Sequence, residues 1–497
     1  MSIIDYDLLS IQESRILVEN AKEAHHKLLT FPQEKLDRIV ESMASEVSKH
    51  LLELAKMSRE ETDYGIWEDK YIKNRFTCEY VLNAIRDMHC VGILGEDKAK
   101  GTMEVGVPVG IIVALPPATS PVSTTIYKAF MAVKTGNAMI FSPHPRARET
   151  MGKVLDILIG TALENGLPEG ALSYLHTVTP AGTQELMNHP STSLILNTGV
   201  PAMLKGAYKS GKPVIYGGAG NGPAFIERTA DVKQAVKDII FSKTFDNGIV
   251  SAAEQSIVVD RCIEDEVRRE FKNNGAYFMT EEEADKLGSL IFRVDGSLDP
   301  EMVGKSAQEL AQKAGFYISP DVVLLLSEQI YVFDTNPYSR EKLCPVLAYY
   351  IEDDWMQACE KCIELLVSER NAHTLVIHSN DEEVIRQFAL KKPVGRVLVN
   401  TPATFGSMGA TTNLFPSMTL GSGLVGEGIT SDNVTPMNLI YVRKVGYGVR
   451  KTEDLIKSIK DSRVTQKESE AASLIRDNSD ILQQVINTVI RELRDGQ

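Results

Sequence analysis

A buried strand, a helix and a second buried strand follow one another closely between residues 107 and 142, and this pattern restricts the fold more than any other feature. VPVGIIVAL (107–115) is apolar throughout, and PVSTTIYKAFMAVKTG (121–136) has helical spacing, with Ser120 as N-cap and Pro121 in its first turn. NAMIFS (137–142) is again mostly apolar. A strand, a helix and a strand of this length predict a right-handed crossover in a parallel sheet.

The same alternation recurs further along the chain. TSLILNTG (192–199) and KPVIYGG (212–218) have the composition of buried strands, and VPAMLKGAYKSG (200–211) has helical spacing. The alternation predicts a doubly wound, Rossmann-like α/β domain over most of residues 100–240. A second α/β region is expected from about 241 to 428, with strands in QSIVVD, LAYYIE, TLVIHS and RVLVNT.

Length and composition exclude several classes of protein. At 497 residues the chain exceeds the ~250–300 at which a single core stops growing, so two or three domains are expected. The net charge of −14 argues against nucleic-acid binding, because no basic field is present to displace counterions. The N-terminus has no signal-peptide pattern, and the longest apolar run, VGIIVALPP (109–117), is far shorter than the ~20 residues of a membrane helix. We therefore expect a soluble, cytoplasmic protein.

The six cysteines are few for so long a chain and indicate a reducing environment rather than a disulfide framework. Cys359 and Cys362 form a C-x-x-C motif within WMQACEKCIELL, which has helical spacing. A zinc site would need a second pair of ligands, and the sequence offers none. We interpret both as ordinary helix cysteines and predict no metal site.

Two turns of the first predicted sheet are candidates for anion binding. PPATS places Thr119 and Ser120 between the carboxyl end of a strand and the amino end of a helix, and Thr198 and Gly199 follow another strand. Free N–H groups at such turns attract phosphate, so two turns at one sheet edge could hold a dinucleotide. GGAGNG (217–222) resembles G-x-G-x-x-G only superficially, because it precedes a strand rather than opening a helix.

The C-terminal part of the chain has a different character. GSMGATTNLFPSMTLGSGLVGEG (406–428) is too long for a plain connection and predicts a functional loop, and VTPMNLIYVRKV (434–445) predicts a returning strand. DSRVTQKES (461–469) is expected to be a polar linker. Residues 470–497 predict an amphipathic helix whose apolar stripe comprises Leu474, Ile481, Leu482, Val485, Ile486, Val489, Ile490 and Leu493. The stripe should be buried, either on the protein's own globule or a sister subunit, or in another assembly that the helix addresses.

Taken together, the segments resemble one known family. The chain carries, in order, VPVGIIVALPPATSPVST, NAMIFSPHPRA, NTGVPAMLKGAY, GGAGNGPAFI, FDNGIVSAAEQS, EKLCPVLA and HTLVIHS. This series is similar to the CoA-acylating aldehyde dehydrogenases, which include acetaldehyde and succinate-semialdehyde enzymes and the N-terminal half of the bifunctional aldehyde–alcohol dehydrogenases. The resemblance covers about residues 7–450. It implies oxidation of a short aldehyde by NAD, with coenzyme A as co-substrate, to an acyl-CoA.

The resemblance also implies the aldehyde dehydrogenase fold. We expect an NAD-binding domain at 1–240, a catalytic domain at 241–428, an oligomerisation strand at 429–450, and a linker with the helical tail at 451–497. Residues 97–110 are expected to join the oligomerisation strands, which pair between the subunits of a homodimer or tetramer. Members of this group are often cargo of bacterial microcompartments. The tail is therefore a candidate address helix for shell proteins or other cargo, which would place the protein inside such a compartment.

Carried over position by position, the family's site falls on several segments. In the family a cysteine thiolate attacks the aldehyde, hydride passes to the nicotinamide, and CoA releases the acyl group. The implied catalytic residues are Ser251 in the nucleophile's place, Thr119 at the oxyanion-supporting turn, and His373. The implied cofactor-binding residues are Pro117, Ser142, His144, Pro145, Thr198, Gly199, Gly217, Gly218 and Glu341. Glu341 would hold the nicotinamide ribose, and Gly217 stands where hydrolytic relatives carry a glutamate general base.

The sequence departs from the family at its reactive residue, because Ser251 replaces the cysteine. A thiol, with a free pKa of about 8.5, ionises near neutrality, whereas an alcohol needs an adjacent base, and no histidine lies near Ser251 in sequence. Other family positions have changed as well. The asparagine expected in the turn is Ser120, the glycines expected before HT are Arg370 and Ala372, and LGCG has become LGSG at Ser422.

Three interpretations of this site stay open. The chain is an acylating aldehyde dehydrogenase with a substituted nucleophile, or a catalytically inactive paralogue that acts as a structural or regulatory cofactor-binding subunit. The third interpretation is an enzyme of changed chemistry that uses Ser251 or Cys344. For Cys344 the alternative is a buried thiol that serves packing alone, and for His373 it is a hydrogen-bonded core histidine.

Overall fold

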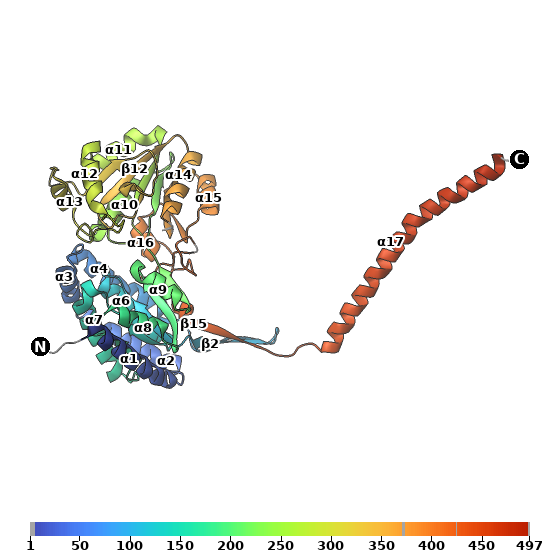
Figure 1. Cartoon of the computed structure of the whole chain (residues 1–497), viewed down its shortest axis with the longest axis horizontal. Coiled ribbons are helices and arrows are strands. Elements are labelled where there is room, and N and C mark those ends of the chain that lie inside the picture. Colours follow the sequence, from blue (N-terminus) through green and yellow to red (C-terminus); the bar gives the residue numbers. More distant parts are fainter. Residues whose placement is uncertain (1–4, 370–372, 424, 496–497) are drawn as a thin grey trace. The chain divides into compact units, whose positions relative to one another are not determined.

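A computed structural model describes residues 5–369, 373–423 and 425–495, and forms two compact units. One unit comprises residues 1–92 with 106–442, and the other comprises 93–105 with 443–497. The first unit contains two parallel sheets with helices packed on them (Figure 1). The α/β class and the two-sheet organisation predicted from the sequence are confirmed.

The first sheet has five parallel strands in the order β5-β4-β3-β6-β7. Their bounds are β3 (Ile111–Leu115), β4 (Ala138–Phe141), β5 (Leu172–Tyr174), β6 (Thr192–Thr198) and β7 (Val214–Gly217). The crossover from β3 to β4 runs through α6 (Pro121–Lys134), which is buried along its whole length. This is the strand, helix and strand that the sequence predicts.

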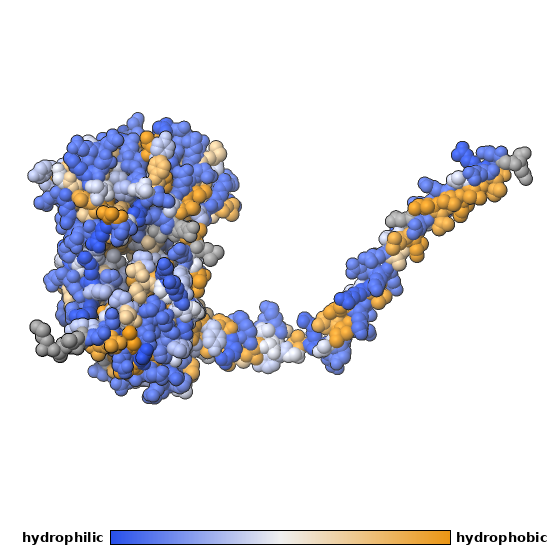
Figure 2. Space-filling view, viewed as in Figure 1, coloured by the Kyte–Doolittle hydropathy of each residue, from blue (hydrophilic) through white to orange (hydrophobic). Residues whose placement is uncertain are grey.

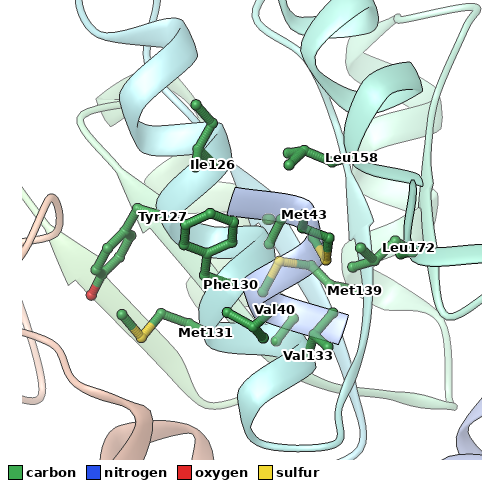
Figure 3. Close-up of a cluster of buried hydrophobic side chains, with 14 of the residues drawn as sticks. Val40, Met43, Ile126, Tyr127, Phe130, Met131, Val133, Met139, Leu158 and Leu172 are labelled. Carbon is green, nitrogen blue, oxygen red and sulfur yellow. The ribbon is translucent and has the colours of Figure 1, made fainter. Parts of the chain in front are cut away.

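Helices cover both faces of this sheet and build its core. They are α1 (Tyr6–Leu28), α2 (Gln33–Ser48), α3 (Leu51–Thr62), α4 (Trp67–Phe76), α5 (Leu82–Arg86), α7 (Arg148–Glu164), α8 (Pro180–Asn188) and α9 (Leu204–Lys209), with a π-helical turn at Thr77–Val81. Figure 3 shows part of the core, where Met43 of α2, Phe130 of α6 and Met139 of β4 gather. Burial of such side chains, each worth about 1.5–3 kcal/mol, fixes α6 and therefore the turn that precedes it.

The second sheet has seven parallel strands in the order β10-β11-β12-β9-β8-β13-β14. Their bounds are β8 (Pro223–Ile226), β9 (Ser256–Asp260), β10 (Ala276–Phe278), β11 (Leu324–Glu328), β12 (Val346–Glu352), β13 (Thr374–His378) and β14 (Arg396–Val399). Its helices are α10 (Val232–Thr244), α11 (Glu264–Asn273), α12 (Glu281–Ile291), α13 (Ala307–Ala314), α14 (Trp355–Ser368), α15 (Glu382–Lys391) and α16 (Ala403–Met408).

The expected boundary at residue 240 needs correction. Strand β8 pairs in parallel with β9 and with β13, so it belongs to the second sheet although it lies before 240. The chain crosses from the first sheet to the second between β7 and β8, within GGAGNG. Local sequence could not assign β8, because its partners come from later in the chain.

A small third sheet and one long helix account for most of the second unit, and the sheet's strands begin or end within the first unit. Strands β1 (Gly92–Asp97), β2 (Thr102–Pro108) and β15 (Ile440–Gly446) form the sheet, and an ion pair joins Lys444 to Glu104. The returning strand predicted at 434–445 corresponds to β15.

The polar linker expected at 461–469 is wrong, because a single helix, α17 (Thr452–Asp495), runs through it. Glycine and proline are absent from 452–495, and its Lys, Glu, Gln and Arg residues are good helix formers. The polar composition of residues 461–469 therefore indicates that the segment is exposed to solvent, not that it is a non-helical linker. The predicted apolar stripe lies along one side of α17 and is exposed (Figure 2). Among the described residues, no helix is long and apolar enough to cross a membrane.

Candidate active site

Ser251 lies in a loop between α10 and β9, at the amino edge of the second sheet. The chain leaves α10 through a tight turn at Phe245–Gly248, in which Asp246 and Asn247 have left-handed φ angles of 50° and 52°. Such conformations are uncommon for residues other than glycine and need support from their surroundings. The turn directs the loop 249–251 towards the carboxyl edge of the first sheet, where the loop lines a cavity together with Pro117, Thr198 and Gly217.

A cavity of about 220 Å³ opens beside Ser251. Residues from the carboxyl ends of β3, β6 and β7 line it, together with the Ser251 loop and Glu341. Eight of the residues that the sequence assigned to the site line this one cavity: Pro117, Thr119, Thr198, Gly199, Gly217, Gly218, Ser251 and Glu341. The ends of parallel strands are where ligands bind in open α/β sheets, so the position favours a binding site.

A larger cavity of about 1130 Å³ adjoins the first. Both are lined by Pro201, Ala219, Leu298 and Glu341. The larger cavity extends over α9 and the segment 426–429, of which 426–428 belong to the functional loop predicted from the sequence. The two spaces together can accommodate a ligand much longer than an aldehyde.

Three predicted cofactor residues lie elsewhere. Ser142, His144 and Pro145 line a separate cavity of about 90 Å³. The Ser142 hydroxyl pairs with the Thr183 hydroxyl at 2.8 Å, and burial lowers the pKa of His144. Val200 lines this cavity and follows Gly199, which lines the one at Ser251, so the two spaces meet the same turn after β6.

His373 approaches Ser251 in space, although 122 residues separate them in sequence. Its Nε2 atom lies 3.4 Å from the Ser251 Oγ, and its Nδ1 lies 2.7 Å from the Thr374 hydroxyl. Burial, followed by the charge of Arg396, lowers the pKa of His373 to about 3. The imidazole is therefore neutral and a weak base, which is a poor activator for an alcohol.

Glu341 faces the cavity and accepts a hydrogen bond from the Gly220 N–H at 2.9 Å. Burial raises the pKa of Glu341 to about 8, and the Gly220 hydrogen bond opposes that rise. The carboxyl group is thus largely protonated at neutral pH when no ligand is bound. When a ligand's hydroxyl groups donate hydrogen bonds to this carboxyl group, they stabilise its ionised form, so the group can release its proton as the ligand binds.

Two glycines bring the backbone close to the site. A Cβ atom at Gly220 would lie 2.0 Å from the Ser251 carbonyl oxygen and 2.5 Å from the His373 Nε2. A Cβ atom at Gly217 would lie 3.0 Å from both the Leu420 carbonyl oxygen and the Thr419 Cγ2. A glutamate in the place of Gly217 would therefore have to displace the 419–420 segment, which is consistent with a site that lacks this general base.

Sequence reasoning missed a buried ionic cluster behind the turn 119–120. The Lys70 and Lys73 ammonium groups lie 3.2 Å and 2.6 Å from the Asp246 Oδ2, and all three side chains are buried. Both lysines donate to the Thr119 carbonyl oxygen at 3.3 Å, and Lys73 also donates to the Ser120 hydroxyl at 2.7 Å. The i, i+3 spacing of the lysines on one helix face is a signal, but a surface face has the same spacing.

Cys344 does not supply a reactive thiolate to the site. Cys344 is buried, and burial raises the pKa of its thiol to about 11, which argues against its use as a nucleophile. Cys359 and Cys362 are buried in α14, as predicted for ordinary helix cysteines.

Across the described residues, no group of His, Cys, Asp or Glu side chains could hold a metal ion. Ser422 donates to the Gly426 carbonyl at 2.8 Å, whereas Arg370 and Ala372 lie outside the described residues.

Fold and site together define a class: a two-sheet α/β protein in which Ser251 lines a cavity at the carboxyl ends of the strands of the first sheet. The aldehyde dehydrogenase family model matches residues 3–412. The chain belongs to the aldehyde dehydrogenase family.

Curated relatives identify the branch of the family that this chain resembles. The bifunctional aldehyde-alcohol dehydrogenase of Escherichia coli (strain K12) is 39% identical over 441 residues, which are 88% of this chain and 49% of that protein. This chain therefore spans about half the length of that relative. The succinate-semialdehyde dehydrogenase (acetylating) of Clostridium kluyveri is 32% identical over 440 residues, 88% of this chain and 96% of that protein.

Solved structures agree with this assignment. A probable aldehyde dehydrogenase from Listeria monocytogenes EGD-e matches with a TM-score of 0.89 and 47% identity over 91% of this chain and 100% of that one. A propionaldehyde dehydrogenase of Rhodopseudomonas palustris, with bound CoA and an acylated cysteine, matches at 0.79 and 26% identity, over 87% and 97%. A propionaldehyde dehydrogenase from a Clostridium phytofermentans bacterial microcompartment matches at 0.79 and 27%, over 88% and 97%.

Proposed function

We propose that this chain is built for the NAD-dependent, CoA-acylating oxidation of a short aldehyde, and that Ser251 limits its covalent step. One observation carries the proposal: the Ser251 hydroxyl, the Glu341 carboxyl and the turns after β3, β6 and β7 line a single cavity. Relatives with this fold act as acylating dehydrogenases, and one of them holds CoA and an acylated cysteine. The finer choice of NAD over NADP is part of the proposal.

The residues present fit a dinucleotide. The cavities on either side of Glu341 share four lining residues and offer a continuous path from the turn after β6 to Ser251. Glu341, Thr198 and Gly199 line the cavity at Ser251, and we propose that Glu341 would accept hydrogen bonds from the nicotinamide ribose and that Thr198 and Gly199 would bind beside the pyrophosphate. Bound NAD would accept the hydride that leaves the aldehyde carbon.

The lining of the cavity favours an uncharged aldehyde. Among its residues in the described chain, Glu341 is the only one with an ionisable carboxyl, amino, guanidinium or imidazole group. None of the described residues that line this cavity carries a cation to neutralise the carboxylate of succinate semialdehyde, and an unpaired buried charge is costly. We therefore propose an acetaldehyde-type substrate.

The place of Gly217 supports acyl transfer to CoA rather than to water. A water molecule needs a general base to become a nucleophile, and the hydrolytic base position has no side chain here. Adjacent atoms of the 419–420 segment fill the direction in which such a side chain would point. A thiol co-substrate ionises more readily and does not need that base to the same extent.

A second candidate is an inactive cofactor-binding subunit, and the Ser251–His373 pair favours it. An alcohol becomes a nucleophile when a base removes its proton, but burial and Arg396 keep His373 a weak base. In this alternative the chain binds the dinucleotide or CoA and regulates or completes an oligomer without turnover.

One experiment tests the acylating function and separates the candidates. The Ser251→Cys chain is incubated with acetaldehyde, propionaldehyde or succinate semialdehyde, with NAD or NADP, with and without CoA. We expect one acyl-CoA per reduced cofactor by mass spectrometry, formed only with CoA, and fastest with NAD and the uncharged aldehydes. Formation of the free acid without CoA contradicts the acylating assignment. Dinucleotide binding without turnover in either chain supports the second candidate.

We propose in addition that α17 addresses the protein to a bacterial microcompartment. The apolar stripe of α17 is exposed from Leu474 to Leu493, and one structural relative comes from such a compartment. Removal of 462–497 should leave a folded homodimer or tetramer but abolish co-assembly with shell proteins. A Leu482→Asp, Ile486→Asp chain should behave like the deletion, whereas changes on the polar face, such as Gln483→Asp, should not. Co-assembly that persists after the deletion contradicts this role.

A further inference from the structure

The C-x-x-C motif of α14 has a neighbour that the local sequence does not show. Cys359 is 2% exposed and Cys362 is fully buried, and both belong to the hydrophobic core of the second sheet. Lys392, which follows α15, reaches into this core and places its Nζ atom 2.6 Å from the Cys359 Sγ. The same ammonium donates to the Cys359 carbonyl oxygen at 2.8 Å. A lysine from a distant segment therefore holds the first cysteine of the motif by two contacts.

The surroundings of Lys392 do not balance its charge with a carboxylate. The buried Lys73 and Lys134 pair with Asp246 and Asp37, whereas within the described ranges of the chain no carboxylate forms an ion pair with Lys392. Its Nζ atom instead lies 4.1 Å from the centroid of the Phe388 ring. Proteins use lysines in apolar surroundings of this kind as amine nucleophiles. The contact with sulfur is thus a pairing of a potential nucleophile with an oxidisable atom.

A small oxidant can reach this pair. Lys392 lines a cavity of about 270 Å³, together with Ser422, Thr430 and Ser431. The cavity is far larger than the ~10–15 Å³ that one water molecule requires, and hydrogen peroxide is only slightly larger than water. Peroxide converts a cysteine sulfur to a sulfenic acid, which condenses with a nitrogen nucleophile to a sulfenamide. Reacting atoms about 3–3.5 Å apart are already poised for attack, and the nitrogen and sulfur lie closer than that.

We propose that Cys359 and Lys392 form a reversible sulfenamide cross-link when the protein meets hydrogen peroxide. The Cys359 sulfur attacks one peroxide oxygen and becomes S–OH, and the other oxygen leaves with the thiol proton as water. Sulfur loses two electrons in this step, and peroxide gains them. The Lys392 amine, after releasing a proton to water, then attacks the sulfur. An S–N bond forms, the S–O bond breaks, and the hydroxyl leaves with a proton from nitrogen as a second water.

The cross-link would tie α14 to the segment that leads into β14. Arg396 lies four residues after Lys392 and donates to the carbonyl oxygens of His373 and Gly421, both at 2.9 Å. The two linked residues are 33 apart in sequence, and closing a loop of that length restricts the unfolded chain. Oxidation should therefore stabilise the fold behind the Ser251 site. The inference does not depend on the proposed function.

Peptide mapping of the full chain after mild treatment with hydrogen peroxide tests the cross-link. The three side chains fall in different tryptic peptides, with Cys359 in 343–361, Cys362 in 362–370 and Lys392 in 392–396. We expect a linked species of 343–361 with 392–396 whose mass is the sum of the two peptides less two hydrogen atoms. Dithiothreitol should separate it, because a thiol attacks the sulfur and releases the amine, and two thiols are oxidised to a disulfide.

Two further readings of the same digest locate the bond. Fragmentation of the linked species should place the link at Cys359 rather than at Cys344, which lies in the same peptide. Cys362 should remain a free thiol that iodoacetamide alkylates once the treated chain is unfolded.

Matched variants assign the nitrogen. Lys392→Arg keeps the positive charge but removes the amine, and it should abolish the linked species. Lys391→Arg changes the neighbouring exposed lysine and should leave the yield unchanged, as should Cys362→Ser. In the unsubstituted chain, peroxide should raise the thermal midpoint by several degrees and dithiothreitol should reverse the rise, whereas Lys392→Arg should show neither change. Thermal midpoints before treatment check that each variant is folded.

Each outcome supports or overturns the inference. Absence of the linked species from the treated, unsubstituted chain overturns it. A disulfide that joins 343–361 to 362–370 in its place also overturns it, because Cys362 would then capture the sulfenic acid first. Equal yields in Lys391→Arg and Lys392→Arg would assign the link to another amine. The acylating function is tested separately by turnover of the Ser251→Cys chain, so failure of the cross-link leaves it intact.

Discussion

The Nε2 atom of His373 lies 3.4 Å from the Oγ atom of Ser251, and the Arg396 guanidinium donates to the His373 carbonyl oxygen at 2.9 Å. The pair resembles the nucleophile and base of a serine hydrolase in distance but not in electrostatics. A buried imidazole beside a guanidinium resists protonation, so it cannot take the hydroxyl proton readily. The geometry is that of a binding and orienting contact.

This relationship predicts that Ser251 is unreactive towards reagents that label activated serines. Incubation with a fluorophosphonate at pH 7–8 should leave Ser251 unmodified, measured by the intact mass of the protein and by peptide mapping. Trypsin, labelled in the same tube, is the positive control. Rapid labelling of Ser251 that His373→Gln abolishes would show that His373 is an effective base.

The raised pKa of Glu341 predicts that the affinity of the protein for NAD depends on pH. The carboxylate accepts hydrogen bonds from ribose hydroxyls, and with a pKa of about 8 it must lose a proton when it does so. Affinity should therefore rise with pH up to about 8, by up to tenfold per pH unit, and level off above. Calorimetry in buffers of different ionisation enthalpy should detect proton release at pH 7. Glu341→Gln should bind more weakly and lose the pH dependence; retention of the same profile would assign it to another group.

The close approach of Gly220 to the Ser251 backbone can be tested by adding a methyl group at position 220. A methyl group there would meet the Ser251 backbone oxygen, which cannot rotate away, so Gly220→Ala should destabilise the fold by about 1–3 kcal/mol and weaken NAD binding. Gly160→Ala is the matched control, since Gly160 is exposed in α7 with open space around it, and alanine should stabilise that helix by about 0.5–1 kcal/mol. Urea unfolding of both variants measures the difference. Equal stability of the two would refute the close approach at Gly220.

The buried cluster around Asp246 predicts a large loss of stability when its charge is removed. Asp246→Asn leaves the Lys70 and Lys73 ammonium groups without their carboxylate, and breaking a buried pair typically costs about 3–5 kcal/mol. Glu185→Gln, which breaks an exposed pair with Arg15, should cost about 1 kcal/mol or less. The free energy of unfolding in urea distinguishes the two. A change below about 1 kcal/mol for Asp246→Asn would contradict the buried pairing.

The sequence predicts the parts of this molecule that local pattern determines. The crossover from β3 to β4 follows from apolar runs and from the signals at Ser120 and Pro121, and motif order predicts the eight residues around the Ser251 cavity. The assignment of β8 fails because sheet membership depends on partners far along the chain. The approach of His373 to Ser251, and of Lys73 to Ser120, are tertiary contacts that no spacing encodes.

We propose that the side chain at 251 stands in the nucleophile's place of an acylating aldehyde dehydrogenase. Its most direct test is NADH formation from acetaldehyde with CoA, compared between this chain and Ser251→Cys under identical conditions. We predict that the cysteine chain is faster by at least about a thousandfold, because a thiolate attacks without the strong base that the site lacks. Equal rates in the two chains would contradict this account of Ser251, and a cysteine chain that binds NAD yet forms no NADH would contradict the catalytic role of the position.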